Sequence, residues 1–252
     1  MSNTCSPSCA LHSSRVRASA LAAALLAVGG FTLASTAQAV TLNLPVDPAP
    51  YADTTLPGTT SAARPELAGT VLQDVLTPFS FNGLSGTVQS RVVKEDGSGT
   101  LDFYWKVNVD SSSVAVTGAP YDVSSLRVAN FGVANIVDGD WRSDGLGTVA
   151  PSAARVFSPS FYPNGDVNFL FSGAHLSAGQ SSNLFFLHTD ATSYAQTALF
   201  DLVGDGLAPD AISSSFSTFA PAVPEPRAWF MLGAGLAMVL SVGARRRAGA
   251  AR

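Results

Sequence analysis

Histidines His175 and His188 are the residues best suited to acid–base chemistry, because they are the only histidines between residues 40 and 222. A serine hydrolase would pair one of them with a nucleophilic serine and a carboxylate, commonly with the serine in a Gly-x-Ser-x-Gly turn. The sequence contains no such pentapeptide. His188 alternates with Leu184 and Phe186 in a strand-like run, a pattern that favours a partly buried structural histidine over a catalytic base.

Carboxylates offer a second kind of chemistry, since a glycosidase holds two Asp or Glu side chains about 5–10 Å apart. The only glutamates between residues 40 and 222 are Glu66, in a proline-rich stretch, and Glu95, in a predicted turn. Asp102 stands on a predicted strand face and is a further candidate. None of these positions indicates a pair. We therefore predict that the protein is not an enzyme and has no cofactor.

Three aspartates, Asp138, Asp140 and Asp144, gather in one short stretch and offer the oxygen ligands that Ca²⁺ prefers. The stretch lacks the other ligands of an EF-hand loop, and Arg142 stands where another acid would help. Asx turns are the favoured interpretation, so these residues are a weak candidate for a calcium site and no metal is predicted.

Two aromatic residues of the same region, Trp141 and Tyr162, suggest a different role. Exposed aromatic rings in β-sandwich proteins can stack on sugar rings, because the ring has an apolar body. Trp141 and Tyr162 are therefore weak candidates for ligand binding.

The elements that would position these residues are short strands. Residues 100–109 alternate strictly, with apolar residues on one face and polar residues and Tyr104 on the other, which predicts a strand packed on one side and wet on the other. Residues 87–94 read as the preceding strand, and the Gly- and Asp-containing stretch 95–99 reads as a turn. The two strands should form an antiparallel hairpin.

Further strands are predicted at 126–131, 167–171, 183–189 and 214–219. No stretch between 69 and 220 keeps a helical apolar period, and thirteen of the fifteen phenylalanines lie there. We predict an all-β fold over residues 69–220, an antiparallel β-sandwich for which a jelly roll is one form. Residues 40–68 contain five prolines and are predicted to be an irregular entry segment.

Charge excludes one class of partner. Residues 40–222 hold seventeen acidic and seven basic side chains, a net charge of −10. A protein that binds nucleic acid neutralises phosphates with Lys and Arg, so nucleic-acid binding is not expected. An acidic body suits a soluble exported domain.

The N-terminus has the pattern of a secretory signal peptide. Arg15 and Arg17 precede an apolar stretch at 18–33, and Ala37 and Ala39 are the small residues that a signal peptidase reads, so residues 1–39 should be removed. Both cysteines lie in this leader, and the predicted mature chain contains none. An exported fold without disulfides must rely on its core.

The C-terminus has three parts. A linker at 221–227 holds Val223, Pro224, Glu225 and Pro226, whose two prolines favour an extended, exposed backbone. Residues 228–244 carry no charge and, as a helix of about 26 Å, would just cross a thin membrane. A basic tail at 245–252 begins with Arg245, Arg246 and Arg247, which should stay cytoplasmic and fix the topology.

This tail resembles the PEP-CTERM sorting signal of Gram-negative bacteria, through Pro224-Glu225-Pro226, the short apolar span and the arginine cluster. The resemblance implies an exosortase as partner, a transient stay in the inner membrane and delivery to the cell surface or extracellular matrix alongside exopolysaccharide. Residues 85–93, 99–105 and 186–194 also resemble ectodomains found in such proteins, for which the resemblance implies no activity.

Taken together, the sequence predicts a non-enzymatic exported protein that acts as a structural or matrix-associated component. Two other functions stay open. A carbohydrate-binding module would need exposed aromatic residues aligned on one face, and a secreted hydrolase would need His175 or His188 beside a serine and an aspartate.

Overall fold

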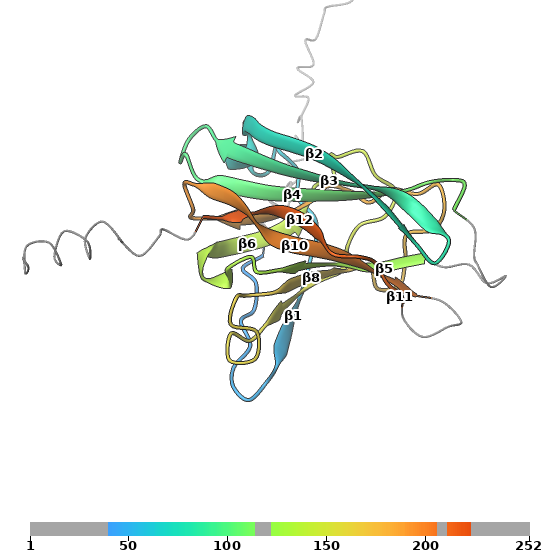
Figure 1. Ribbon diagram of the computed structural model, residues 1–252. Coiled ribbons are helices and arrows are strands. Elements are labelled where there is room, and N and C mark those ends of the chain that lie inside the picture. The colour runs from blue at the N-terminus through green and yellow to red at the C-terminus, as the bar shows by residue number, and fades with distance from the viewer. Residues whose placement is uncertain (1–39, 114–121, 206–210, 223–252) are drawn as a thin grey trace, which may run out of the picture. The chain divides into compact units, whose positions relative to one another are not determined.

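The computed structural model describes residues 40–113, 122–205 and 211–222, and within them the fold is all-β, without an α-helix. Two antiparallel sheets share one core (Figure 1). The five-stranded sheet has the order β2 (Gly69–Phe81), β3 (Leu84–Glu95), β4 (Leu101–Val109), β9 (Phe185–Thr189) and β6 (Ile136–Trp141).

The seven-stranded sheet has the order β1 (Tyr51–Thr55), β7 (Ala153–Phe157), β8 (Val167–Leu170), β5 (Asp122–Ala129), β10 (Tyr194–Asp205) and β11 (Ala211–Ile212), and β12 (Phe216–Pro221) also pairs with β10. Two short 3₁₀ segments, η1 (Pro65–Leu67) and η2 (Val133–Asn135), complete the regular structure of the described residues. The predicted antiparallel two-sheet fold is confirmed, and the jelly-roll form stays a prediction.

Aromatic side chains fill the space between the sheets. Trp105 of β4 is 1% exposed, and its ring lies 6.0 Å from that of Phe169 in β8, while the Phe169 and Phe185 rings lie 4.5 Å apart. Full burial of each such side chain contributes about 1.5–3 kcal/mol. The core therefore joins strands of both sheets through direct ring contacts.

The predicted hairpin is confirmed, because β3 and β4 pair in antiparallel register from Gly86 opposite Val109 to Lys94 opposite Leu101. The strands predicted at 126–131, 167–171, 183–189 and 214–219 correspond to β5, β8, β9 and β12, with boundaries shifted by a few residues. Local alternation was therefore a sound guide to these elements.

The outer face of β4 differs from the prediction of a wet surface. Asp102 is 0% and Tyr104 is 3% exposed. Leu67 of η1 packs with Tyr104 and Phe186 in a second apolar cluster, so the segment at 60–68 covers this face. The predicted entry segment at 40–68 is also less irregular than expected. It contains both β1 and η1, and β1 pairs along its whole length with β7.

The strands β2, β6, β7, β10 and β11 were not predicted. β2 is an edge strand in which most residues are exposed, so it lacks the apolar alternation of a half-buried strand. β6 contains Asp138 and Asp140, which the sequence suggested were in turns.

No helix among residues 40–113, 122–205 and 211–222 is long and apolar enough to cross a membrane. The predicted signal peptide at 1–39, the motif at 223–226, the span at 228–244 and the basic tail at 245–252 lie outside the described residues.

Candidate functional site

A row of polar side chains crosses the outer face of the seven-stranded sheet. The strand register places one residue of each of five neighbouring strands directly opposite the next: Asp53, Arg155, Asn168, Arg127 and Asp201. The chain neighbours of the last four residues, such as Val128 and Leu202, are core residues. Because successive side chains of a strand point to opposite faces, this polar row points away from the core.

Ion pairs close both ends of the polar row. Arg155 donates to Asp53 through Nε at 2.7 Å and Nη2 at 2.9 Å, and Arg127 donates to Asp201 through Nε and Nη2, both at 2.6 Å. Between them, the Asn168 amide has no side-chain hydrogen bond to any described residue. The middle of the row therefore offers one free amide, which can donate and accept.

Aromatic rings line one side of the polar row. Tyr162, from the loop between β7 and β8, packs on Phe157 with ring centroids 4.8 Å apart, and Phe157 lies 5.9 Å from Tyr51. The Arg155 guanidinium lies 4.0 Å from the centre of the Tyr51 ring. Tyr162 is 42% exposed, so part of its ring is free to meet a ligand.

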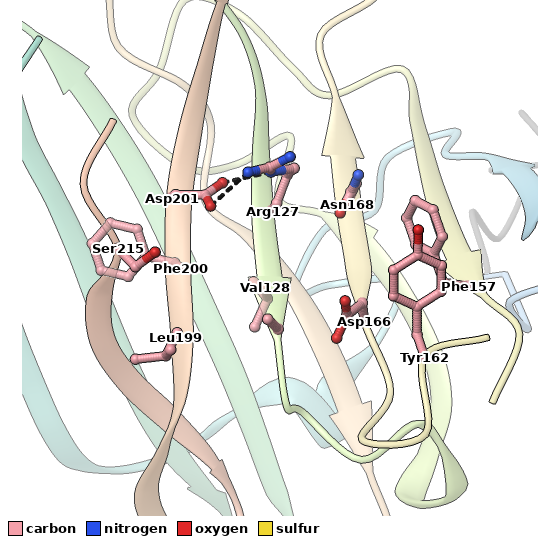
Figure 2. A pocket seen from close by; sticks show the side chains of 11 residues that line it. Arg127, Val128, Phe157, Tyr162, Asp166, Asn168, Leu199, Phe200, Asp201 and Ser215 are labelled. Atoms are coloured by element: carbon pink, nitrogen blue, oxygen red, sulfur yellow. Dashed lines mark hydrogen bonds and ion pairs between the residues drawn. The ribbon is translucent and has the colours of Figure 1, made fainter. Parts of the chain in front are cut away.

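A pocket of about 250 Å³ lies where the row meets these rings. Figure 2 shows the Arg127–Asp201 pair, Asn168, Asp166 and the two rings of Phe157 and Tyr162 around it. The hydrogen bonds to Asp201 raise the pKa of Arg127, which stays charged at any physiological pH. Burial raises the pKa of Asp166, one oxygen of which accepts from the backbone N–H of Asn130 at 3.2 Å.

The pocket has the chemical features of a site for a neutral polar ligand. It combines fixed planar donors and acceptors with a partly exposed aromatic ring, and its one cation is already paired. Hydroxyl groups match such planar partners, and the apolar face of a sugar ring matches an aromatic ring. No histidine lines it, and its carboxylic acids are Asp166 and Asp201.

The two predicted sugar-stacking residues belong to different parts of the fold. Tyr162 belongs to the pocket, whereas Trp141 ends β6 of the five-stranded sheet. Trp141 is half-buried, packs against the main core, and donates through Nε1 to the Leu56 carbonyl at 3.2 Å. A residue that stacks on sugars should be exposed, and Trp141 is not fully exposed because the segment at 56–59 lies against its indole ring.

The three aspartates of the weak calcium candidate have separate partners. Asp138 accepts from Arg64 at 2.9 and 3.2 Å, Asp140 accepts from two backbone N–H groups at 2.8 and 2.9 Å, and Asp144 accepts from Arg142 at 2.7 and 2.9 Å. Within the described ranges, these three carboxylates do not group at metal-ligand distances. Two of them lie in a strand, so Asx turns do not explain them either.

Neither histidine is isolated. His175 Nδ1 lies 3.6 Å from Asp205, and His188 Nδ1 lies 2.8 Å from Asp102. No serine or threonine hydroxyl of the described chain hydrogen-bonds to either ring. A histidine–aspartate pair is therefore present at His188, as the hydrolase alternative requires, but the nucleophile of a triad is not seen beside it.

Sequence reasoning missed Arg127, Asn168 and Asp201. Each lies at an outward-pointing position of a strand with alternating burial. That position in the alternation was the only sign of these residues in the local sequence. What makes them a site is the register between β8, β5 and β10, and this register joins residues far apart in the chain.

Comparisons of the chain with protein-family models, with curated proteins and with solved structures found no match.

Proposed function

We propose that the protein is a non-enzymatic exported protein, processed by signal peptidase and an exosortase and delivered to the cell surface or exopolysaccharide matrix. The observation that carries this proposal is the order of features in the tail: Pro224-Glu225-Pro226, the apolar residues 228–244, and Arg245 to Arg247. Each feature has its own physical role, namely an extended recognition segment, a temporary membrane anchor and a positive end that stays cytoplasmic.

The body of the chain supports the same proposal. Residues 40–222 contain no cysteine and carry a net charge of −10. Their sandwich is held by an aromatic core rather than by disulfides, so its folding does not depend on the redox state of the compartment. A structural or matrix-associated role needs such a self-sufficient domain.

The test replaces the acidic residue of the motif in the native host. We expect Glu225→Ala to leave an unprocessed, membrane-retained precursor, measured by intact mass and by fractionation of cells and medium. Asp96→Ala, which removes an exposed carboxylate from the turn after β3, is the matched control and should be processed like the wild type. Equal mature mass and equal location of Glu225→Ala and wild type would refute the proposal.

A second candidate function, binding of a neutral glycan by the sandwich, is favoured by one observation. The pocket brings Tyr162 beside Asn168 and the Arg127–Asp201 pair, which is the mixture of ring and planar polar groups that sugars need. This function is compatible with residence in an exopolysaccharide matrix. Trp141 plays no part in it.

Binding should be measured with exopolysaccharide purified from the host and with a glycan array. An aromatic contact contributes about 0.5–1.5 kcal/mol, so Tyr162→Ala should weaken binding by a factor of about 2 to 13. Phe161→Ala is the matched control, since Phe161 is 55% exposed, adjacent in sequence and does not line the pocket. Equal losses for the two variants, or no binding by the wild type, would remove the glycan candidate.

A further inference from the structure

Three titratable side chains meet on the outer face of the five-stranded sheet, away from the pocket described above. They are Glu95 at the end of β3, Asp102 in β4 and His188 in β9, and we call them the Glu-Asp-His cluster. Asp102 lies directly opposite His188 in the strand register. One ligand atom from each of the three side chains lies within 4.8 Å of the others.

Both carboxylates of the Glu-Asp-His cluster are buried. Asp102 is 0% and Glu95 is 3% exposed. Ser98 and Thr100 hydroxyls donate to Glu95 Oε2, the second at 3.0 Å, and this holds the carboxylate so that Oε1 faces His188 Nδ1 at 3.1 Å. Oε1 itself accepts no hydrogen bond from any described residue, although it is fully buried. A buried oxygen without a partner requires an explanation.

The His188 ring cannot satisfy both carboxylates. Asp102 Oδ1 lies 2.8 Å from Nδ1, and Glu95 Oε1 lies 3.1 Å from the same nitrogen. A ring nitrogen carries at most one proton and donates it along one direction. One nitrogen and two oxygens that converge in this way are better suited to surround a cation than to share one hydrogen.

The charges around the Glu-Asp-His cluster also favour a bound cation. Asp138 lies opposite His188 on the other side, and Arg64 pairs with both Asp138 and Glu66. No lysine or arginine of the described chain pairs with Glu95 or Asp102. The two buried carboxylates therefore have one ion-pair partner among the described residues, the mostly buried His188 imidazole, and buried charges without full pairing are costly.

We propose that Glu95, Asp102 and His188 bind a divalent first-row transition-metal ion, with Zn²⁺ as its best probe. Imidazole nitrogen with carboxylate oxygen is a donor set that such ions accept, whereas Ca²⁺ prefers oxygen alone. Tetrahedral zinc with bonds of about 2.0–2.1 Å separates its ligand atoms by about 3.3–3.4 Å. The observed separation of 3.1 Å needs to widen by about 0.2–0.3 Å and that of 2.8 Å by about 0.5–0.6 Å to match this geometry.

The ion would join the end of β3 to β4 and β9. Backbone pairing, the Tyr104–Phe186 ring contact and the hydrogen bond from Thr189 Oγ1 to the Leu101 carbonyl also hold these strands together. Because residues 40–222 contain no cysteine, a bound metal ion would link the strands in the way that a disulfide would.

The experiment uses the full-length chain, purified without a histidine tag in detergent and stripped with EDTA. Cys5→Ser and Cys9→Ser are introduced into every sample, because the leader offers competing ligands. Calorimetric titration with ZnCl₂ should give one site per chain, and Zn²⁺ should raise the Tm by several degrees. Co²⁺ should give a visible absorption band of the strength expected for four-coordination.

Glu95→Gln and Asp102→Asn should each weaken Zn²⁺ affinity at least tenfold, while circular dichroism without metal checks that they fold. His175→Gln is the matched control, because His175 lies beside one aspartate only and should bind as the wild type does. A wild type without saturable binding up to millimolar Zn²⁺ would overturn the proposal even where a variant fails to fold. Stabilisation by Ca²⁺ but not Zn²⁺, or loss of the site in His175→Gln alone, would also overturn it.

Discussion

Replacing Thr218 by valine should loosen the connection between the two sheets. Trp105 of β4 donates through its indole Nε1 to Thr218 Oγ1 of β12 at 3.1 Å, and both residues are 1% exposed. Thr218 in turn donates to Ser90 Oγ at 3.2 Å. Valine has nearly the same shape as threonine, so the substitution removes the hydroxyl without opening a cavity and leaves the indole N–H buried and unpaired.

The expected cost follows from that orphaned donor. A buried polar group left without its partner costs about 1–3 kcal/mol. For a body of this size, each kcal/mol lowers the Tm by about 2–4 °C, so the loss should be about 2–12 °C. Because β12 pairs with β10, which carries Asp201, the same hydrogen bond supports the strand that forms one side of the pocket.

Thermal and urea unfolding followed by circular dichroism measure the effect. Thr70→Val, at an exposed position of β2, is the matched control and should change stability by no more than about 0.5 kcal/mol. In a Trp105→Phe background the donor is gone, and Thr218→Val should then cost far less. If Thr218→Val behaves like the control, or costs as much without the indole as with it, the reasoning is wrong.

Two further predictions concern the segment that covers β6. Burial raises the pKa of Asp140 to about 6, above its unfolded value of about 4, so its contribution to stability falls as the pH rises from about 4 through 6. In Asp140→Asn, urea unfolding across this range should lose that decline, and an unchanged slope would contradict the assignment. Gly58 has φ +86°, and a Cβ there would stand 2.4 Å from Trp141 Cζ2. Gly58→Ala should therefore cost about 2 kcal/mol or more in thermal unfolding, while Gly97→Ala, with open space around it, should cost little, and equal costs would refute the packing argument.

The sequence was informative where the signal is local. The alternation at 100–109 and the turn at 95–99 predicted the β3–β4 hairpin, since side chains of a strand point to opposite faces whatever the rest of the chain does. The high phenylalanine content predicted a large apolar core, and Trp105 and Phe169 now lie at its centre. The leader and tail are also local patterns, and their roles stay predictions.

The elements that the sequence missed are those whose partners are distant. β1 lies among prolines and has weak local preference for a strand, yet it pairs with β7 about a hundred residues away. β2 lacks alternation because an exposed edge strand needs only one neighbour for its backbone hydrogen bonds. Local propensity yields to pairing at such positions.

The composition and the periodicity of the chain determined by themselves that its body is all-β with an aromatic core, while the export signals on either side of that body remain predictions. Only the tertiary structure placed Arg127 opposite Asp201, buried Asp102 beneath the segment at 60–68, and turned Glu95 and His188 toward each other. The physical reason is that strand order and register are decided by long-range backbone pairing and by which faces are covered. Neither the long-range pairing nor the covering of a face produces a periodic sequence pattern at the residues that are brought together.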